Sequence, residues 1–134
     1  ALLEQGLAVK DLPDEWNRRY QELLGVQPMN DAEGCLQDVH WSEGLFGYFP
    51  SYLLGHLISA QLSEAMAEAI GSPEEHVERG DVTPLLAWLR ENVHPLGRSV
   101  NADQLVDRVS GRPLSTDAFL DYLENKLDRL QPAP

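Results

Sequence analysis

Apolar residues recur every three or four positions in five segments of this sequence, which is the spacing of one face of an α-helix. Prolines and glycines bound these segments, since Pro13 precedes and Gly25 follows the first, and Gly71 follows the longest. The five segments predict helices over residues 13–24, 50–70, 83–93, 102–110 and 115–130. A sixth, short helix is predicted over 73–79, between Ser72 and Gly80. No segment alternates apolar and polar residues as a strand does, so we predict an all-α chain.

Capping residues support three of these helices. Ser72 precedes Pro73 and two glutamates, which is an N-cap followed by acids that interact favourably with the helix dipole. Thr83 before Pro84 repeats the pattern, and Asn101 is a further N-cap. We expect these three side chains to accept hydrogen bonds from the first amides of their helices.

The segment from Val26 to Phe49 has no sustained period and predicts a long loop, with room for one short helix at 31–37. Loops of this length are usually functional or disordered, and the aromatic residues here argue against disorder. Aromatic rings beside hydrogen-bonding groups fit the wall of a binding pocket. The more ordinary alternative is a buried polar network that holds the loop. The chemically capable residues are Gln37, Asp38, His40, Trp41, Tyr48, Ser51, Tyr52 and His56.

Composition narrows the possible partners. The 134 residues suffice for one domain, and 43% apolar with 24% charged residues is an ordinary globular composition. Acidic residues outnumber basic ones by 22 to 10, and the net charge of −12 repels phosphate groups. We therefore expect neither nucleic acid nor membrane partners. The single cysteine and the lack of a secretion signal predict a cytoplasmic protein.

Residues 44–63 contain no charged side chain, but their glycines, serines and Pro50 make a membrane span improbable. The four histidines lie at least 16 positions apart, so no local spacing predicts a metal site. The first residues, closed by Gly6, suggest the end of a helix that begins outside this sequence, and hence a piece of a longer protein. We expect the tail 131–134 to be frayed.

One run of the loop resembles a known family. Residues Gly34 to Trp41 match the signature Gly-x-x-Gln-Asp-x-His-Trp of the thermostable (Taq-type) zinc metallocarboxypeptidases. The segments 6–16, 47–52 and 80–90 also resemble that family. The resemblance covers essentially the whole chain, 1–134, as a single helical region and the C-terminal quarter of a larger helical metallopeptidase fold. The resemblance implies that the loop 26–49 lines the catalytic cleft of the enzyme and that residues 50–70 form a long central helix.

The resemblance implies removal of single residues from peptide C-termini by a water activated at zinc or cobalt. The family's His-Glu-x-x-His metal motif and its Ile-Arg-x-x-Ala-Asp motif are not in this sequence. We therefore expect the isolated chain to be inactive and to bind no metal. The implied partners are peptide substrates, the upstream part of the same polypeptide and a second copy in a homodimer. The alternative is a stand-alone acidic helical module that binds other proteins.

The resemblance also suggests roles for six residues. We expect His40 and Tyr52 to donate hydrogen bonds to the transition state, with Tyr48 as the competitor for Tyr52 or as an anchor of the loop. Substrate binding is assigned to Gln37, Asp38 and Trp41. Asp38 has an alternative role in fixing the tautomer of His40 or capping a turn, and Trp41 in packing. Cys35 is expected to pack, and His56 to be a satisfied core residue.

Overall fold

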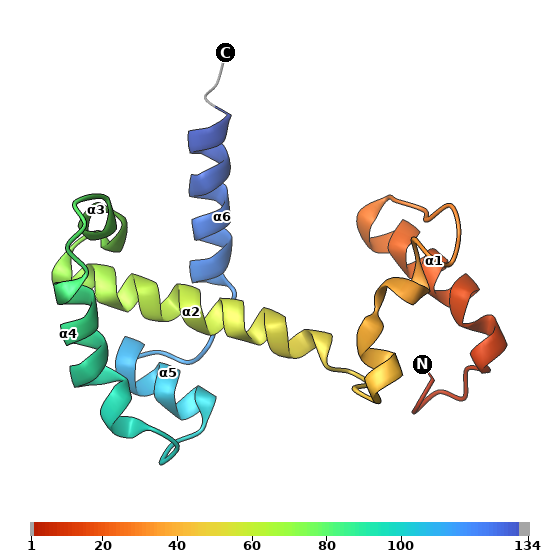
Figure 1. Cartoon of the computed structure of the whole chain (residues 1–134), viewed down its shortest axis with the longest axis horizontal. Coiled ribbons are helices and arrows are strands. Elements are labelled where there is room, and N and C mark those ends of the chain that lie inside the picture. Colours follow the sequence, from red (N-terminus) through yellow and green to blue (C-terminus); the bar gives the residue numbers. More distant parts are fainter. Residues whose placement is uncertain (1, 132–134) are drawn as a thin grey trace. The chain divides into compact units, whose positions relative to one another are not determined.

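The computed structural model describes residues 2–131, and these contain helices but no strands, which confirms the predicted all-α class (Figure 1). The α-helices are α1 (Leu12–Leu24), α2 (Phe49–Ile70), α3 (Pro73–Glu78), α4 (Thr83–Asn92), α5 (Ala102–Ser110) and α6 (Asp117–Leu130). The short 3₁₀ helices are η1 (Val9–Asp11), η2 (Cys35–Gln37), η3 (Val39–Glu43) and η4 (His94–Leu96). The chain divides into two compact units, Ala1–Tyr48 and Phe49–Pro134, which we call unit 1 and unit 2.

Unit 1 consists of α1 and the loop that folds against it. Pro13 lies in the first turn of α1, and Gly25 ends the helix in the left-handed conformation at φ 67°. Gly34 shows how closely the loop approaches, because a Cβ there would lie 3.3 Å from the Asn17 side chain and from Pro28. A larger residue at position 34 would press on these neighbours.

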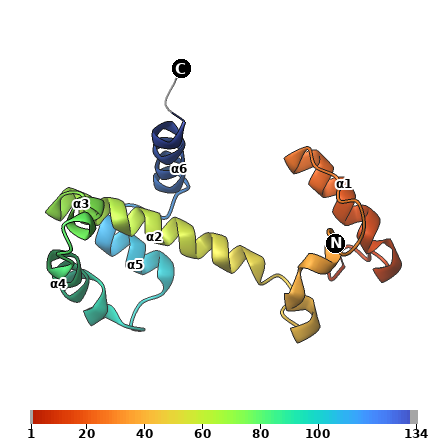
Figure 2. The same cartoon turned by 45° about the horizontal axis from the view of Figure 1, so that its top comes forward.

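Unit 2 is built around α2, its longest helix. Figure 2 shows α4, α5 and α6 next to the middle and the C-terminal half of α2. The apolar side chains buried among these helices are Leu57, Met66, Trp88, Val106 and Ala118. The predicted apolar face of α2 is buried only in part, since Leu53 and Leu54 are about half exposed at 53% and 49%.

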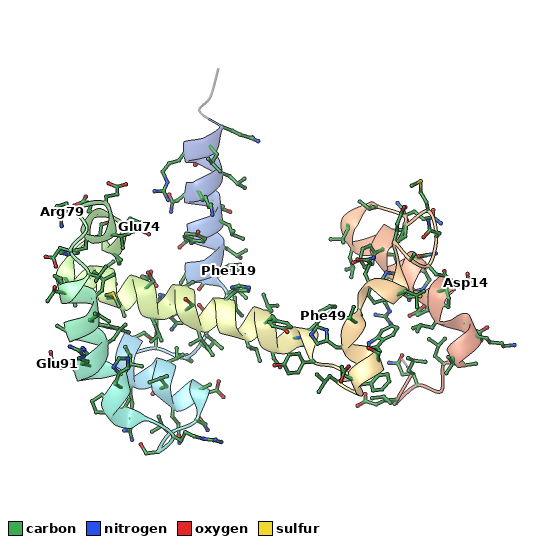
Figure 3. All side chains as sticks on the ribbon, in the orientation of Figure 1. Asp14, Phe49, Glu74, Arg79, Glu91 and Phe119 are labelled. Atoms are coloured by element: carbon green, nitrogen blue, oxygen red, sulfur yellow. The ribbon has the colours of Figure 1, made fainter. Side chains whose placement is uncertain are left out.

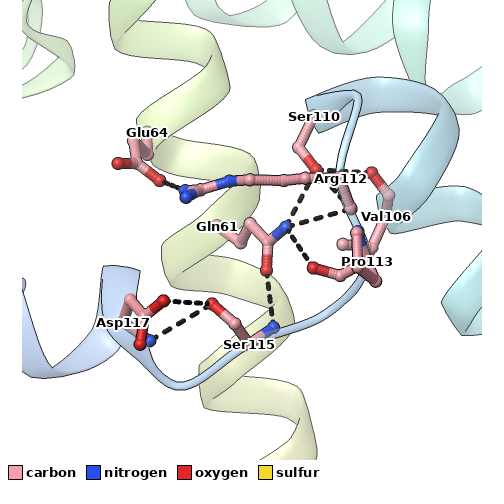
Figure 4. Close-up of polar contacts among 8 residues, drawn as sticks. All are labelled: Gln61, Glu64, Val106, Ser110, Arg112, Pro113, Ser115 and Asp117. Carbon is pink, nitrogen blue, oxygen red and sulfur yellow. Dashed lines mark hydrogen bonds and ion pairs between the residues drawn. The ribbon is translucent and has the colours of Figure 1, made fainter.

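A buried glutamine ties the α5–α6 connection to α2 (Figure 4). Gln61 is fully buried, and its Nε2 donates to Ser110 Oγ at 2.9 Å and to the Pro113 carbonyl at 3.1 Å. Its Oε1 accepts the Ser115 N–H at 3.1 Å. Both ends of the amide are therefore paired, as a buried polar group requires. The salt bridge between Arg112 and Glu64 adds a second link.

Several predicted helix ends are corrected by the structure. Thr83 does not cap α4, because it is the first residue of the helix and the side chain of Asp81 accepts its N–H at 3.1 Å. The last helix begins at Asp117, two residues later than predicted, since Ser115 bonds instead to Gln61 and to Asp117. Ser72 and Asn101 do cap their helices, and Asn101 forms a reciprocal capping box with Gln104.

Two further differences concern the start of the chain and the loop. Residues 2–4 form a turn instead of the expected helix end, while Ala1 and the tail residues 132–134 lie outside the described residues. The short helix predicted at 31–37 is confined to the 3₁₀ turn η2, and η3 follows it. No helix in the described part of the chain is long and apolar enough to cross a bilayer.

Candidate functional site

The loop that carries the candidate site is held by its own backbone. The N–H of Leu36 donates to the Asp31 carbonyl and that of Gln37 to the Gly34 carbonyl, both at 3.0 Å. Cys35 is 4% exposed, which agrees with its predicted packing role. The side-chain amide of exposed Gln37 donates to the Ala32 carbonyl and so ties the same turn. These bonds fix the backbone immediately before Asp38.

Asp38 and His40 form the polar centre of the loop. Asp38 Oδ1 accepts the backbone N–H of His40 at 3.1 Å, which caps η3, and lies 2.9 Å from Nδ1 of the imidazole. The exposed fractions of the two side chains are only 9% for Asp38 and 17% for His40. Both alternative roles predicted for Asp38, a cap and a partner of His40, are therefore present. The carboxylate holds the ring by one nitrogen and fixes its orientation.

The two tyrosines lie in different units. The ring of Tyr48 stacks on the His40 imidazole with centroids 5.3 Å apart and planes 26° from parallel. Tyr52 lies in the first turn of α2, where its ring centroid is 6.2 Å from that of Phe49. Both side chains are partly exposed, at 42% for Tyr48 and 51% for Tyr52. Unit 1 by itself thus brings together Asp38, His40 and Tyr48.

Trp41 belongs to an aromatic cluster rather than to the Asp38–His40 pair. Its ring meets Trp16 of α1 edge to face at 5.8 Å and stacks on Phe46 at 6.4 Å. Together with leucines from the start of the chain, these rings line an open pocket of about 330 Å³. This favours the packing role for Trp41. The sequence indicated Trp16 only as part of the apolar face of α1, and nothing in it linked the two tryptophans.

The rim of this pocket carries an ion-pair network. Glu15 accepts hydrogen bonds from Arg18 at 2.8 Å and from Arg19 at 2.6 Å. The two guanidinium groups, Arg18 first, lower the pKa of the Glu15 carboxyl to about 2. The cause is direct hydrogen bonding to the charged form, which favours ionisation. At the rim itself the network pairs the carboxylate of Glu15 with the guanidinium of Arg19.

The other three histidines all lie in unit 2. His56 is exposed on α2 and stacks on Phe119 at 6.0 Å, so the expected core position is wrong; Figure 3 labels Phe119 at the start of α6. His76 pairs through its ring nitrogens with the Ile70 carbonyl and with Arg79. Among residues 2–131, no three side chains of the His, Cys, Asp or Glu type are placed to hold a metal ion.

Comparisons with known proteins find carboxypeptidases that match almost the whole chain. Carboxypeptidase 1 of Bacillus subtilis (strain 168) is 42% identical over 130 residues, which are 97% of this chain and 26% of that protein. Thermostable carboxypeptidase 1 of Thermus thermophilus is 42% identical over 94% of this chain and 25% of its own length. The crystal structure of the M32 carboxypeptidase from Deinococcus radiodurans superposes with a TM-score of 0.85, at 38% identity, over 96% of this chain and 26% of that one.

The chain therefore spans about a quarter of the length of each of these relatives. The family model of the carboxypeptidase Taq (M32) metallopeptidases matches residues 1–127. The match includes the Asp38–His40 pair, α2 and most of α6. The chain belongs to the carboxypeptidase Taq (M32) metallopeptidase family.

Proposed function

We propose that this chain is the C-terminal part of a metal-dependent carboxypeptidase that removes single residues from peptide C-termini, and that it supplies one wall of the cleft. The observation that carries the proposal is the largely buried Asp38–His40 pair within the family match. An imidazole held by a carboxylate at one nitrogen is pre-oriented to bond substrate through the other. Such pre-organisation is what stabilisation of a developing charge requires.

The metal of such an enzyme does not fit the residues described here. The histidines are dispersed over η3, α2, α3 and η4, and no cluster of three metal-ligating side chains includes any of them among residues 2–131. We propose that zinc or cobalt is held by a His-Glu-x-x-His helix in another part of the full-length enzyme. This chain takes no part in binding it, and by itself should release no C-terminal residues from peptides.

His40 is assigned as a donor to the oxyanion that forms when the scissile carbonyl is attacked. Because Nδ1 faces Asp38 at 2.9 Å, Nε2 is the ring atom that we assign to the substrate. Donation from both nitrogens requires the doubly protonated ring. The carboxylate of Asp38 offsets the charge of that ring, while the ring's positive charge favours the oxyanion.

The second donor is a tyrosine hydroxyl. We assign it to Tyr52, because the ring of Tyr48 already stacks on His40 and thereby supports the imidazole. Substitution by phenylalanine separates the two roles, since it removes the hydroxyl and keeps the ring. The phenylalanine of Tyr48→Phe would still stack, so that variant should retain most of its turnover if Tyr52 is the donor.

The test uses a hybrid enzyme in which this chain replaces the matching 26% of Bacillus subtilis Carboxypeptidase 1. Loss of one oxyanion donor typically costs about 2.7–4 kcal/mol, or about a hundred- to a thousandfold in rate. We expect His40→Gln and Tyr52→Phe each to lower kcat on that scale, with KM changed only a few-fold. Steady-state kinetics with a peptide of free C-terminus measure both constants.

Tyr122→Phe provides the matched control, because Tyr122 is a half-exposed tyrosine of α6 far along the chain from the loop. It should leave kcat unchanged. Metal content and thermal melts of the same preparations exclude indirect effects. A Tyr52→Phe hybrid with normal kcat and a lower melting temperature would refute the assignment and leave Tyr48 as the candidate donor. Metal-dependent activity of the isolated chain would refute the proposed division of labour.

A further inference from the structure

Two consecutive residues of α1 touch the loop on either side of His40. Before His40, Gly34 lies so close to α1 that a Cβ there would be 3.3 Å from the side-chain oxygen of Asn17. Directly after His40, the ring of Trp41 meets that of Trp16 edge to face, with centroids 5.8 Å apart. Both contacts lie within unit 1. Helix α1 therefore holds the loop on both sides of the proposed donor.

Trp16 is itself fixed on its helix. Its ring stacks on that of Tyr20, with centroids 5.1 Å apart and planes 22° from parallel. Residues four apart on a helix lie on the same face, so this contact holds the indole in one orientation. The indole N–H is buried and finds no acceptor among residues 2–131. Trp16 therefore acts on the loop through the size and shape of its ring.

The helix that carries His40 is short and depends on its surroundings. η3 spans only Val39–Glu43, and the hydrogen bonds of a 3₁₀ helix have poorer geometry than those of an α-helix. Hydrogen bonds close both of its ends, at Asp38 and at Gly44. Such bonds set where the helix begins and ends, while contacts of its side chains set its rotation about its own axis. Since His40 and Trp41 are neighbours on this one turn, their rings move together when η3 rotates.

We infer that Trp16 is a positioning residue for His40. It holds the ring of Trp41 and thereby fixes the rotation of η3, which keeps the imidazole against Asp38 at 2.9 Å. This role of Trp16 rests on the proposed function, in which His40 donates to the oxyanion. Such a donor is effective because it is pre-organised, and a misplacement of about 1 Å can cost about a hundredfold in rate.

A tryptophan in the other unit separates positioning from stability. If Trp16 only stabilised unit 1, its loss would lower the melting temperature without a specific effect on turnover. Trp88 of α4 is buried in unit 2, with 8% of its surface exposed. Loss of such a core ring destabilises the fold through the cavity that it leaves. In the hybrid enzyme, Trp88→Leu should therefore lower the melting temperature and leave kcat unchanged.

Steady-state kinetics of the hybrid, below the melting temperatures of all variants, give the first readout. We expect Trp16→Leu to lower kcat about tenfold, which is less than a misplacement of about 1 Å can cost, with KM nearly unchanged. Trp16→Phe keeps an aromatic ring against Trp41 and should recover most of this loss. Where His40→Gln lowers kcat, an unchanged kcat in Trp16→Leu, or an equal fall in Trp88→Leu, would overturn the inference. Loss of helical circular dichroism in Trp16→Leu would also overturn it, since Trp16 would then be needed for the fold itself.

Nuclear magnetic resonance of this chain reads the position of the His40 ring without turnover. Histidine labelled with ¹³C at Cε1 gives one signal for each of the four imidazoles, and the signal lost in His40→Gln is that of His40. The stacked ring of Tyr48 shields this imidazole, so Trp16→Leu should move its proton signal downfield, while Trp88→Leu leaves it in place. An unmoved His40 signal in Trp16→Leu would overturn the inference. A moved signal together with normal kcat in His40→Gln would refute the donor role and leave the positioning of the ring intact.

Discussion

Replacing Gln61 should make the stability of unit 2 depend on pH in a direction that the structure fixes. In Gln61→Glu one carboxylate oxygen can still accept the Ser115 N–H. The other takes the place of Nε2, which now donates to Ser110 Oγ at 2.9 Å and to the carbonyl oxygens of Pro113 at 3.1 Å and Arg112 at 3.3 Å. The Ser110 hydroxyl itself donates to the Val106 carbonyl. An ionised carboxylate would face these acceptors at full burial. The nearby guanidinium of Arg112 is already paired with Glu64.

When it is protonated, the carboxyl introduced by Gln61→Glu could donate its one proton to either carbonyl, so folding favours the neutral form. The pKa of this carboxyl is therefore raised in the folded state above its ordinary value of about 4.3. A raised pKa means that the variant is most stable below about pH 4.3. That stability is lost as the pH rises through the folded-state pKa. At pH 7 an uncompensated buried carboxylate costs about 3–5 kcal/mol.

Gln61→Leu separates the charge from the lost hydrogen bonds. It leaves the Ser115 N–H and the Pro113 carbonyl without their partner, and water can reach the exposed Pro113. At about 1–3 kcal/mol for each buried group left unpaired, we expect a loss of about 2 kcal/mol that does not vary with pH. Since 1 kcal/mol shifts the midpoint of a small unit by about 4–8 °C, the melting temperature should fall by about 10 °C.

Thermal melts followed by circular dichroism at pH 4 and pH 7 measure both effects, each relative to the unchanged chain at the same pH. Glu68→Leu, at an exposed position of the same helix, is the control and should shift the midpoint by at most a degree or two. The reasoning is refuted if Gln61→Glu is less destabilised at pH 7 than at pH 4. It is refuted equally if Gln61→Leu has the same melting temperature as the unchanged chain.

Three further predictions concern single side chains. Asn101→Ala removes the capping box with Gln104 and should cost about 1 kcal/mol in denaturant titrations. The pKa of Glu15 is lowered by Arg18 from 4.5 to about 2, so its contribution is complete above pH 4.5 and is lost as the pH falls towards 2; Glu15→Gln should flatten the acid limb of thermal melts over that range. Gly55→Ala, where a Cβ on α2 meets nothing within 4 Å, should raise the free energy of unfolding by about 0.5–1 kcal/mol in urea titrations.

The helices could be predicted from sequence because their ends are set by local chemistry. Gly25 adopts the left-handed conformation that ends α1, and Asn101 bonds to an amide three residues away. Thr83 shows the limit of such patterns. Thr83 and Ser72 both precede proline, but Asp81 stands two residues before Thr83 and accepts its N–H, and Thr83 is the first residue of α4 rather than its cap. The competitor decides the boundary, and the pattern alone does not reveal it.

Contacts between distant segments could not be predicted. Gln61 appears in the sequence as one polar residue among the apolar positions of a long helix, and its partners lie about 50 residues later. Trp16 and Trp41 likewise meet only because the loop folds back on α1. The Asp38–His40 contact is different, because residues two positions apart always lie near each other along the chain. Short spacing made that contact predictable, and the polar network of unit 2 had no such local signal.

Spacing along the chain does not by itself fix the geometry of the two proposed donors. Twelve positions separate His40 from Tyr52, but His40 lies in η3 of unit 1 and Tyr52 in the first turn of α2 in unit 2. No single element therefore fixes one relative to the other, whereas Tyr48 lies against His40 within unit 1. Tyr52→Phe and Tyr48→Phe differ in which hydroxyl is removed while both retain a ring. Their ratio of kcat values in the hybrid enzyme thus decides which of the two hydroxyls is the donor.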